Sequence, residues 1–249
     1  MIPTWLHVLS IAMLVLGVVC ALIIVVDLLR GHAQQMWIMN VVWPVCALFA
    51  TGFALWAYFQ YGRLATKKKM QAAMENDEEP PSKKHTPFPA MVMKGAAHCG
   101  SGCTLGDICA EFLAMAFPVV AIWFGWKTIF PDTHAGKMFA VWILDFVFAF
   151  GIGVAFQYFT IVPMRNLSPG RGIVEAVKAD TLSLISWQVG MYGFMAFAQF
   201  VIFRHVWEYD LEPSQPVFWF VMQLAMLAGF VTAYPVNWWL IRAGIKEAM

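Results

Sequence analysis

The side chains best suited to chemistry are gathered in one stretch, His-Cys-Gly-Ser-Gly-Cys-Thr-Leu-Gly-Asp, which runs from His98 to Asp107. It contains two of the chain's five cysteines and one of its six histidines. Thiolates and imidazoles are soft donors that suit Cu(I) or Zn(II). The two cysteines are separated by three residues, unlike the C-x-x-C of common zinc knuckles and thioredoxin-like centres. We predict a metal site formed by His98, Cys99, Cys103 and Asp107, which binds Cu(I) or, alternatively, zinc.

Two backbone conformations are open for this stretch. If a helix begins early, one helix face carries a residue at every fourth position, namely Cys99, Cys103, Asp107 and Glu111. If the glycines keep the backbone loose, Thr104 caps a later helix, and both thiols precede its N-terminus, where thiolate is favoured. Because two glycines within three residues disfavour a helix, we favour the second conformation. Both thiols are then expected to face cytosolic water.

Two other interpretations of the motif remain open. Cys99 and Cys103 could exchange a reversible disulfide in thiol redox chemistry, although the reducing cytosol disfavours a structural disulfide. Alternatively, the stretch serves packing, because small residues every fourth position allow membrane helices to approach closely: Gly102, Gly106, Ala110 and Ala114. Packing explains the glycines but not the gathering of an imidazole, two thiols and a carboxylate.

The elements that must position this motif are membrane helices. The chain is 61% hydrophobic and 12% charged, about half the charged fraction of a soluble domain. A spanning helix needs about 20 mostly apolar residues. The first apolar run exceeds the core of a signal peptide, so we expect it to be retained. We predict an all-α, polytopic membrane protein with six transmembrane helices: Trp5–Leu29, Met36–Phe59, Leu105–Trp126, Met138–Val162, Ile173–Phe203 and Val217–Ile241.

The distribution of basic residues predicts the orientation of these helices. With six spans, 12 of the 16 lysines and arginines fall on one side of the membrane. Basic residues stay on the cytoplasmic side, so we expect both termini in the cytoplasm, in the inner membrane of a bacterium. Mixed charge and prolines predict a linker. The chain then divides into an N-terminal hairpin (1–62), a cytoplasmic linker loop (63–95) and a four-helix unit (96–249).

Polar side chains inside membrane helices are costly, and each raises a functional hypothesis. Asp107, Asp180, Gln157 and Asn237 are expected towards the cytoplasmic face, and Asp145, Gln199 and Gln223 towards the opposite face. We predict a polar path through the four-helix unit that includes Glu111, Asp145, Gln157 and Asp180. In the alternative, these groups satisfy one another or the backbone freed by Pro118 and Pro235. Met191 and Met195, like Met222 and Met226, lie four residues apart, and we interpret them as core fillers.

The expected partners follow from the same composition. They are the lipid bilayer, a soft metal ion, and a membrane or cytoplasmic protein. A net charge of +1 gives no indication of nucleic-acid binding. We expect no nucleotide, because no phosphate-binding loop or dinucleotide motif is present. We expect no haem, because paired histidines within helices are lacking.

Three stretches resemble a family of bacterial membrane proteins described as domain of unknown function 4396. They are Met36–Val45, with the sequence Met-Trp-Ile-Met-Asn-Val-Val-Trp-Pro-Val, the stretch from His98 to Asp107, and Tyr234–Lys246, with the sequence Tyr-Pro-Val-Asn-Trp-Trp-Leu-Ile-Arg-Ala-Gly-Ile-Lys. The resemblance implies a small helical membrane protein and supplies no activity.

The functional prediction therefore depends on the chemistry of the motif. We predict capture of a soft metal ion, most favourably Cu(I), at the cytoplasmic mouth of the third helix, with translocation through the membrane as its extension. The first alternative is a membrane thiol-disulfide oxidoreductase that uses Cys99 and Cys103. The second is a non-catalytic assembly or accessory subunit that docks through the small-residue stripe. The sequence does not decide whether the chain is an enzyme.

Overall fold

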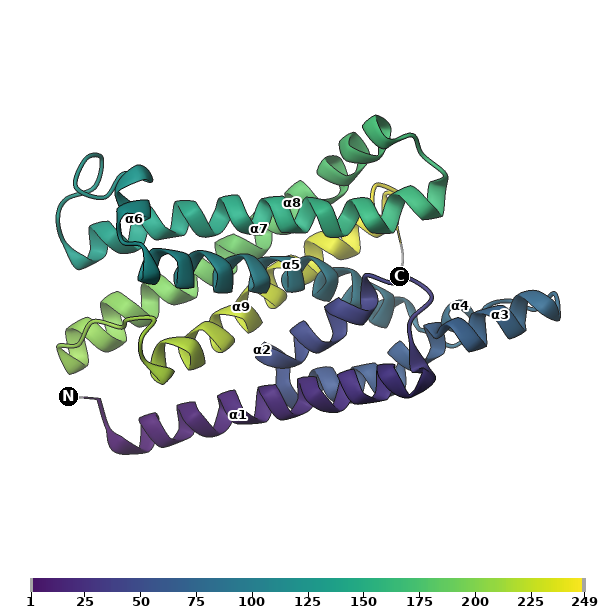
Figure 1. The fold of residues 1–249 in the computed structure, drawn as a ribbon, viewed down its shortest axis with the longest axis horizontal. Coiled ribbons are helices and arrows are strands. Elements are labelled where there is room, and N and C mark those ends of the chain that lie inside the picture. The colour runs from purple at the N-terminus through teal and green to yellow at the C-terminus, as the bar shows by residue number, and fades with distance from the viewer. Residues whose placement is uncertain (1, 248–249) are drawn as a thin grey trace.

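The computed structural model describes residues 2–247, so the outermost residues of the two predicted units, 1 and 248–249, lie outside it. The described elements are all helices, which confirms the all-α prediction for this part of the chain (Figure 1). In order they are α1 (Thr4–Asp27), η1 (Leu28–His32), α2 (Met39–Gln60), η2 (Gly62–Ala65), α3 (Lys67–Glu75), α4 (Pro81–Lys84), α5 (Phe88–Ala116), α6 (Val119–Trp123), α7 (His134–Arg165), α8 (Pro169–Ala196), η3 (Phe197–Val206) and α9 (Pro216–Arg242).

Five helices are long and apolar enough to cross a membrane, which indicates a multi-pass membrane protein. α1 shows the expected lipid-facing surface, with exposed Val15, Val18 and Leu22. Such a surface is stable only in an apolar solvent. The five are α1 with η1 (Thr4–His32), α2 (Met39–Gln60), α7 (His134–Arg165), α8 with η3 (Pro169–Val206) and α9 (Pro216–Arg242).

α2 meets the length criterion, but its two halves fold back on each other. Thr51 leaves the helical region, with φ 44° and ψ −122°. The rings of Trp43 and Tyr58, one from each half, lie 5.7 Å apart in an edge-to-face arrangement. The Gln35 amide donates to the Ala65 carbonyl at 2.9 Å, so the residues flanking α2 meet at one end of the molecule. α2 is therefore a re-entrant hairpin with its tip at Thr51.

An ion pair fastens the base of this hairpin to the end of α1. The Arg63 guanidinium donates to both carboxylate oxygens of Asp27, at 2.5 and 3.0 Å, and the Tyr58 hydroxyl donates to the same carboxylate at 2.7 Å. The hydrogen bonds to Asp27 raise the pKa of Arg63 above its ordinary value. Hairpin and α1 therefore share one anchored end.

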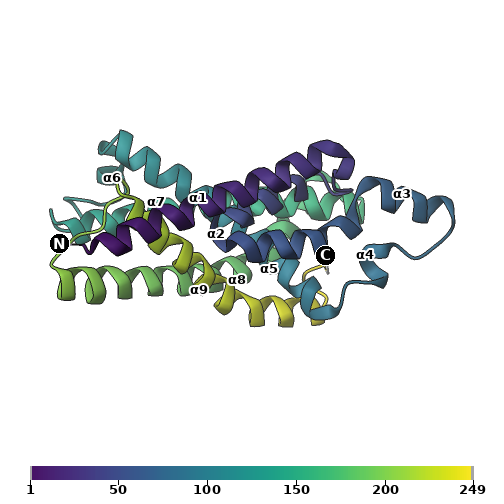
Figure 2. The same ribbon diagram turned by 90° about the horizontal axis from the view of Figure 1, so that it is seen from below.

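The six-span prediction with both termini on one side is not confirmed. Because α2 returns at Thr51, the helices that run lengthwise are α1, α5, α7, α8 and α9. In Figure 1 the N-terminus and the end of α9 lie towards opposite ends of the molecule. The short helices α3 and α4 project beyond the bundle in Figure 2, so the predicted linker is partly helical.

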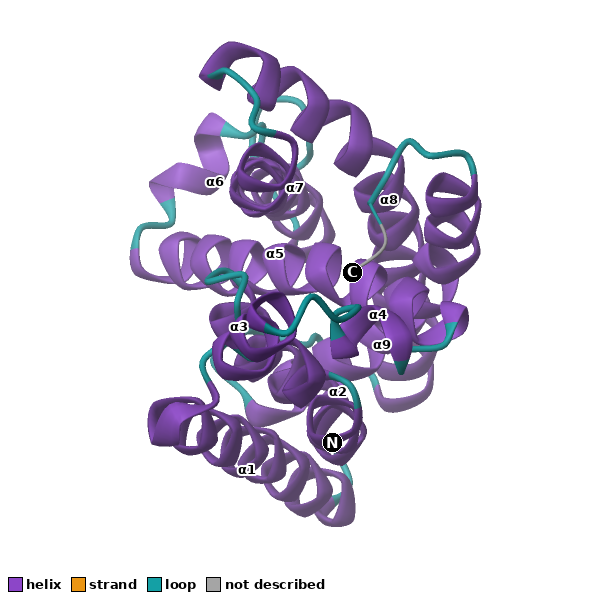
Figure 3. Ribbon diagram, turned by 90° about the vertical axis from the view of Figure 1, so that its right-hand side faces the viewer, coloured by secondary structure: helices purple, strands orange, loops and turns teal. Residues whose placement is uncertain are grey.

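α5 replaces the predicted third span, and that span was wrong at both boundaries. The helix begins at Phe88 instead of Leu105, and it ends at Ala116, just before Phe117 and Pro118. A proline disfavours helical backbone in the residue before it, which explains the early end. α5 is the central helix in the end-on view of Figure 3 and contacts α2, α7, α8 and α9.

Close packing against α7 explains why glycines are accommodated inside α5. A Cβ at Gly106 would lie 2.5 Å from the Ala149 nitrogen, and one at Gly102 would lie 3.0 Å from the Gly153 Cα. At Gly100, a Cβ would overlap the Trp187 ring of α8. Tertiary packing thus outweighs the low helix propensity of glycine. The small-residue stripe is covered by α7 of the same chain and is not a free docking face.

Candidate functional site

The interior of the bundle is polar along one helix. α5 buries two thiols together with ionisable and hydroxyl side chains, and its neighbours bury more polar groups around it. Such groups are rare in membrane interiors and are normally functional. The buried set comprises Lys94, His98, Cys99, Cys103, Thr104, Asp107 and Glu111 on α5, Asp145, Gln157 and Thr160 on α7, Asp180, Ser183 and Gln188 on α8, Asn237 on α9, and Lys246 beyond it.

Cys99 and Cys103 lie inside a continuous helix and not at its mouth, so the favoured prediction of a loose backbone was wrong. Both thiols are fully buried, with 0% exposure. Thr104 does not cap a helix, because its hydroxyl donates to the Gly100 carbonyl one turn earlier at 2.8 Å. The alternative with an early helix is confirmed. Residues four apart share a helix face, and Cys99 lies beside both Cys103 and the Asp180 carboxylate.

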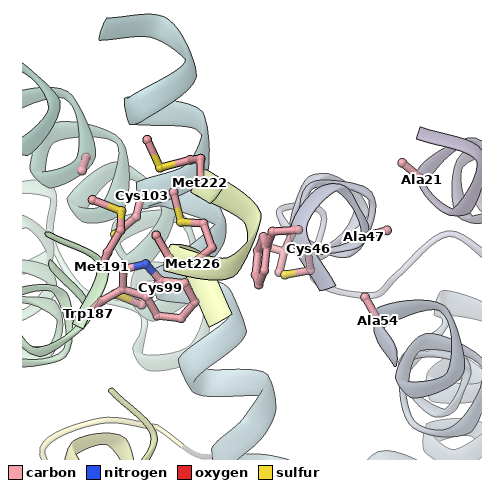
Figure 4. Packing of buried hydrophobic residues seen from close by; sticks show 14 of the residues in the cluster. Ala21, Cys46, Ala47, Ala54, Cys99, Cys103, Trp187, Met191, Met222 and Met226 are labelled. Atoms are coloured by element: carbon pink, nitrogen blue, oxygen red, sulfur yellow. The ribbon is translucent and has the colours of Figure 1, made fainter. Parts of the chain in front are cut away.

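Methionine side chains complete the surroundings of the thiol pair. Figure 4 shows Met191 of α8 and Met226 of α9 gathered with Cys99 and Cys103, all within one buried cluster. The Met226 sulfur also accepts a hydrogen bond from Thr104 at 3.6 Å. Three helices therefore direct soft sulfur atoms into one region. Sequence reasoning interpreted these methionines as fillers; their four-residue spacing was a signal, but it did not reveal which face met the thiols.

The Trp187 indole of α8 covers one side of this sulfur cluster, where it packs between α5, α9 and the α2 hairpin. Its ring lies against Gly100 of α5, while its Nε1 and Cδ1 atoms lie against Gly229 of α9. A Cβ at either glycine would collide with the indole, so both glycines make room for it. Phe49 of the hairpin contacts the same ring edge-to-face at 5.8 Å. The cluster is thereby closed on this side by a rigid aromatic plane.

His98 lies next to the thiol pair in sequence but is directed to α7. Its Nε2 atom is 3.0 Å from the Thr160 hydroxyl oxygen. That hydroxyl donates to the Phe156 carbonyl at 3.1 Å, an arrangement that favours the tautomer with the proton on Nε2. The Nδ1 atom is buried without a partner and retains its lone pair. His98 is thus held against α7 through its Nε2 atom.

A buried ion pair closes the polar interior near the C-terminus. The Lys246 ammonium lies 3.7 Å from the Asp180 carboxylate and is completely buried. It also donates to the Gly95 carbonyl at 3.3 Å and to the Ser183 hydroxyl at 3.4 Å. Asn237 donates to the same hydroxyl at 2.7 Å. Sequence reasoning missed Lys246, because its position after α9 indicated only a cytoplasmic anchor.

Asp107, Glu111 and Asp145 form a second polar group on the other side of the thiols. Their carboxyl groups lie close enough to influence one another. Asp107 therefore lies near Asp145, whereas the sequence grouped it with Asp180 among the residues expected towards the cytoplasmic face. Glu111 reaches a cavity of ≈ 150 Å³ that is also lined by His134 and Lys137. This cavity lies at the end of the bundle where α7 begins.

The predicted metal ligands are only partly brought together. Within residues 2–247, no group of three or more His, Cys, Asp or Glu side chains is placed to hold one ion. Cys99 and Cys103 are adjacent, whereas His98 is directed to Thr160 and Asp107 to the carboxylate group. The donors that accompany the thiols are thioethers. Of the predicted polar path, Glu111, Asp145, Gln157 and Asp180 are all buried.

The helices and their polar interior define a multi-pass helical membrane protein with buried ionisable and sulfur groups. Residues 90–246 match the family described as Domain of unknown function (DUF4396), and the chain belongs to that family. The resemblance seen in the sequence is thereby confirmed. No curated protein and no solved structure matches the chain.

Proposed function

We propose that this protein handles a soft metal ion, Cu(I), inside the membrane at Cys99 and Cys103. The observation that carries the proposal is the pair of adjacent, fully buried thiols within a cluster that also contains Met191 and Met226. Thiolates and thioethers select Cu(I) over harder ions. The thioethers add ligands without adding charge, which favours them where buried charge is costly. The ion is cargo, held in the bundle interior and not at a water-facing mouth.

The helical spacing of the thiols favours a bridging ion over a disulfide. Side chains four residues apart on a helix have Cβ atoms about 5–6 Å apart. A disulfide requires Cβ atoms about 3.5–4.5 Å apart, so it would distort α5. Two sulfur atoms that bind one ion at about 2.3 Å each span up to roughly 4.6 Å, which the helix accommodates without distortion. The geometry therefore supports metal capture over thiol redox chemistry.

The same arrangement supports a translocation route along α5. One end is the Asp180–Lys246 pair beside Cys99. The other end is the carboxylate group of Asp107 and Glu111, which reaches the cavity near α7. The sulfur cluster lies between the two. Midway binding sites flanked by polar groups are typical of membrane transporters.

Charge supports an orientation for this route. With α2 as a re-entrant hairpin, we infer that α5 crosses the membrane in its place, together with α1, α7, α8 and α9, although its polar residues keep α5 out of the five helices selected by length and hydropathy. At about 1.5 Å per residue, the 29 residues of α5 exceed the thickness of a bilayer core. Arg30 then joins the basic end, which holds 13 of the 16 lysines and arginines. Because basic residues stay in the cytoplasm, the N-terminus lies outside and the C-terminus inside, in a bacterial inner membrane.

Metal content of the purified protein tests the proposal. Wild-type protein loaded with Cu(I) under reducing conditions is expected to retain one copper per chain, measured by elemental analysis after desalting. Cys99→Ser with Cys103→Ser is expected to retain almost none. The matched control is Cys20→Ser with Cys46→Ser, since these two thiols are also buried but belong to α1 and α2 and not to the α5 pair. Equal copper content in the two double variants would refute the proposal.

A further inference from the structure

The re-entrant hairpin leaves part of the bundle unfilled. Because α2 turns back at Thr51, it does not continue along the face between α1 and α9 beyond that residue. Beyond its tip lies a cavity of ≈ 260 Å³ lined by residues of α1, α2, α5 and α9. Val18 on its α1 side is half exposed on the lipid-facing surface. The cavity is therefore accessible sideways from the membrane.

The floor of this cavity carries hydrogen-bond acceptors without partners. Both carboxylate oxygens of Asp107 are buried and unpaired, as is the Oε1 atom of Gln223. The Gln223 amide nitrogen is already used, because it donates to the Leu48 carbonyl at 2.6 Å. The single proton of the Thr104 hydroxyl is likewise used, since it is shared between the Gly100 carbonyl and the Met226 sulfur. Unpaired buried acceptors are costly, and a ligand that donates hydrogen bonds would relieve that cost.

The walls of the cavity are apolar and partly aromatic. The rings of Phe112 and Trp219 stack with centroids 5.3 Å apart and planes 18° apart. The Trp219 Nε1 proton is occupied by the Pro213 carbonyl at 2.8 Å, so the indole offers the cavity only its apolar surface. Pockets for small molecules combine such walls with a few polar groups. Flat walls favour a ring with an apolar tail.

We propose that this cavity binds a lipid-soluble aromatic alcohol, with its ring against Trp219 and its hydroxyl donating to Asp107. The hydroxyl and the acceptors are complementary, whereas an ether or a carbonyl at the same place would leave the acceptors unpaired. The ligand enters between α1 and the hairpin tip, and its tail stays in the lipid. This site goes beyond metal handling and uses no residue of the thiol pair.

Two probes that differ by one hydrogen-bond donor test the proposal. Binding of radiolabelled 4-nonylphenol and 4-nonylanisole is measured on the full chain in phosphatidylcholine nanodiscs, with empty nanodiscs as background. The phenol is expected to bind on the order of fivefold more tightly, since one buried hydrogen bond contributes about that much. Equal affinity for the two probes would show partitioning into lipid and would overturn the proposal.

Variants locate the binding in the cavity. Asp107→Ala is expected to lower phenol affinity to that of the anisole. Val18→Trp fills the cavity from the lipid side and is expected to abolish binding of both probes. Leu22→Trp is the matched control, because Leu22 is an exposed residue of the same helix that does not line the cavity. Unchanged phenol binding in Val18→Trp would refute the site. Phenol binding that survives Cys99→Ser with Cys103→Ser separates this proposal from the copper proposal.

Discussion

Replacing Gly106 with alanine tests whether the α5–α7 contact holds the site together. The new Cβ would lie 2.5 Å from the Ala149 nitrogen and 2.6 Å from its Cα. Both atoms belong to the backbone, so the helices must separate by several tenths of an ångström. When packed atoms move apart by about 0.5–1 Å, each pair loses a quarter to a half of its dispersion energy, and this loss extends along the α5–α7 contact. Overpacking of this kind costs about 1–3 kcal/mol.

Gly151→Ala is the control for this substitution, because a Cβ at Gly151 of α7 meets nothing within 4 Å. Both variants gain about 1 kcal/mol of helix propensity, so their difference isolates the steric cost. For a chain of this size, 1 kcal/mol shifts Tm by about 2–4 °C. Gly106→Ala is therefore expected to melt on the order of 5 °C below Gly151→Ala in detergent, followed by tryptophan fluorescence. Equal melting temperatures would refute close packing of α5 on α7.

Two further predictions concern the hairpin and the buried ion pair. Thr51 has a positive φ that glycine adopts without strain, so Thr51→Gly is expected to raise Tm by a few degrees and Thr51→Val to lower it; the opposite order would contradict a turn at this residue. Asp180→Ala leaves the Lys246 ammonium buried without its carboxylate, which costs about 3–5 kcal/mol. Adding Lys246→Met to Asp180→Ala is expected to restore most of the lost Tm, and a further loss would show that the two groups act independently.

The sequence predicted the helical class and the polar side chains, but not how deep they lie or how α2 is folded. Hydropathy measures apolar length, and α2 is long enough to span. Its reversal depends on one residue, Thr51, whose unusual backbone is stabilised by contacts with distant segments, such as Gln223 on the Leu48 carbonyl. Local composition carries no signal of such contacts. The orientation inferred from charge assumed that α2 crosses the membrane, and it is not confirmed.

The start of α5 at Phe88 was not predicted either, because it also depends on contacts with distant segments. Gly100 and Gly102 predicted loose backbone, because propensity considers a helix in isolation. In the structure both positions favour glycine, because a Cβ at Gly100 would overlap the Trp187 ring and a Cβ at Gly102 would lie 3.0 Å from the Gly153 Cα. The four-residue spacing of Cys99 and Cys103 was the reliable signal, since it follows from helix geometry alone. Which methionines meet the thiols depends on helix packing and was not predictable.

X-ray absorption at the copper edge tests the proposed site most directly. Cu(I) bound to the wild-type protein is expected to show a first shell of sulfur alone, because thioethers lie with the thiols and the His98 Nε2 atom is directed to Thr160. Met191→Leu with Met226→Leu is expected to reduce the number of sulfur neighbours while copper remains bound to Cys99 and Cys103. A first shell dominated by nitrogen or oxygen would contradict the intramembrane sulfur site.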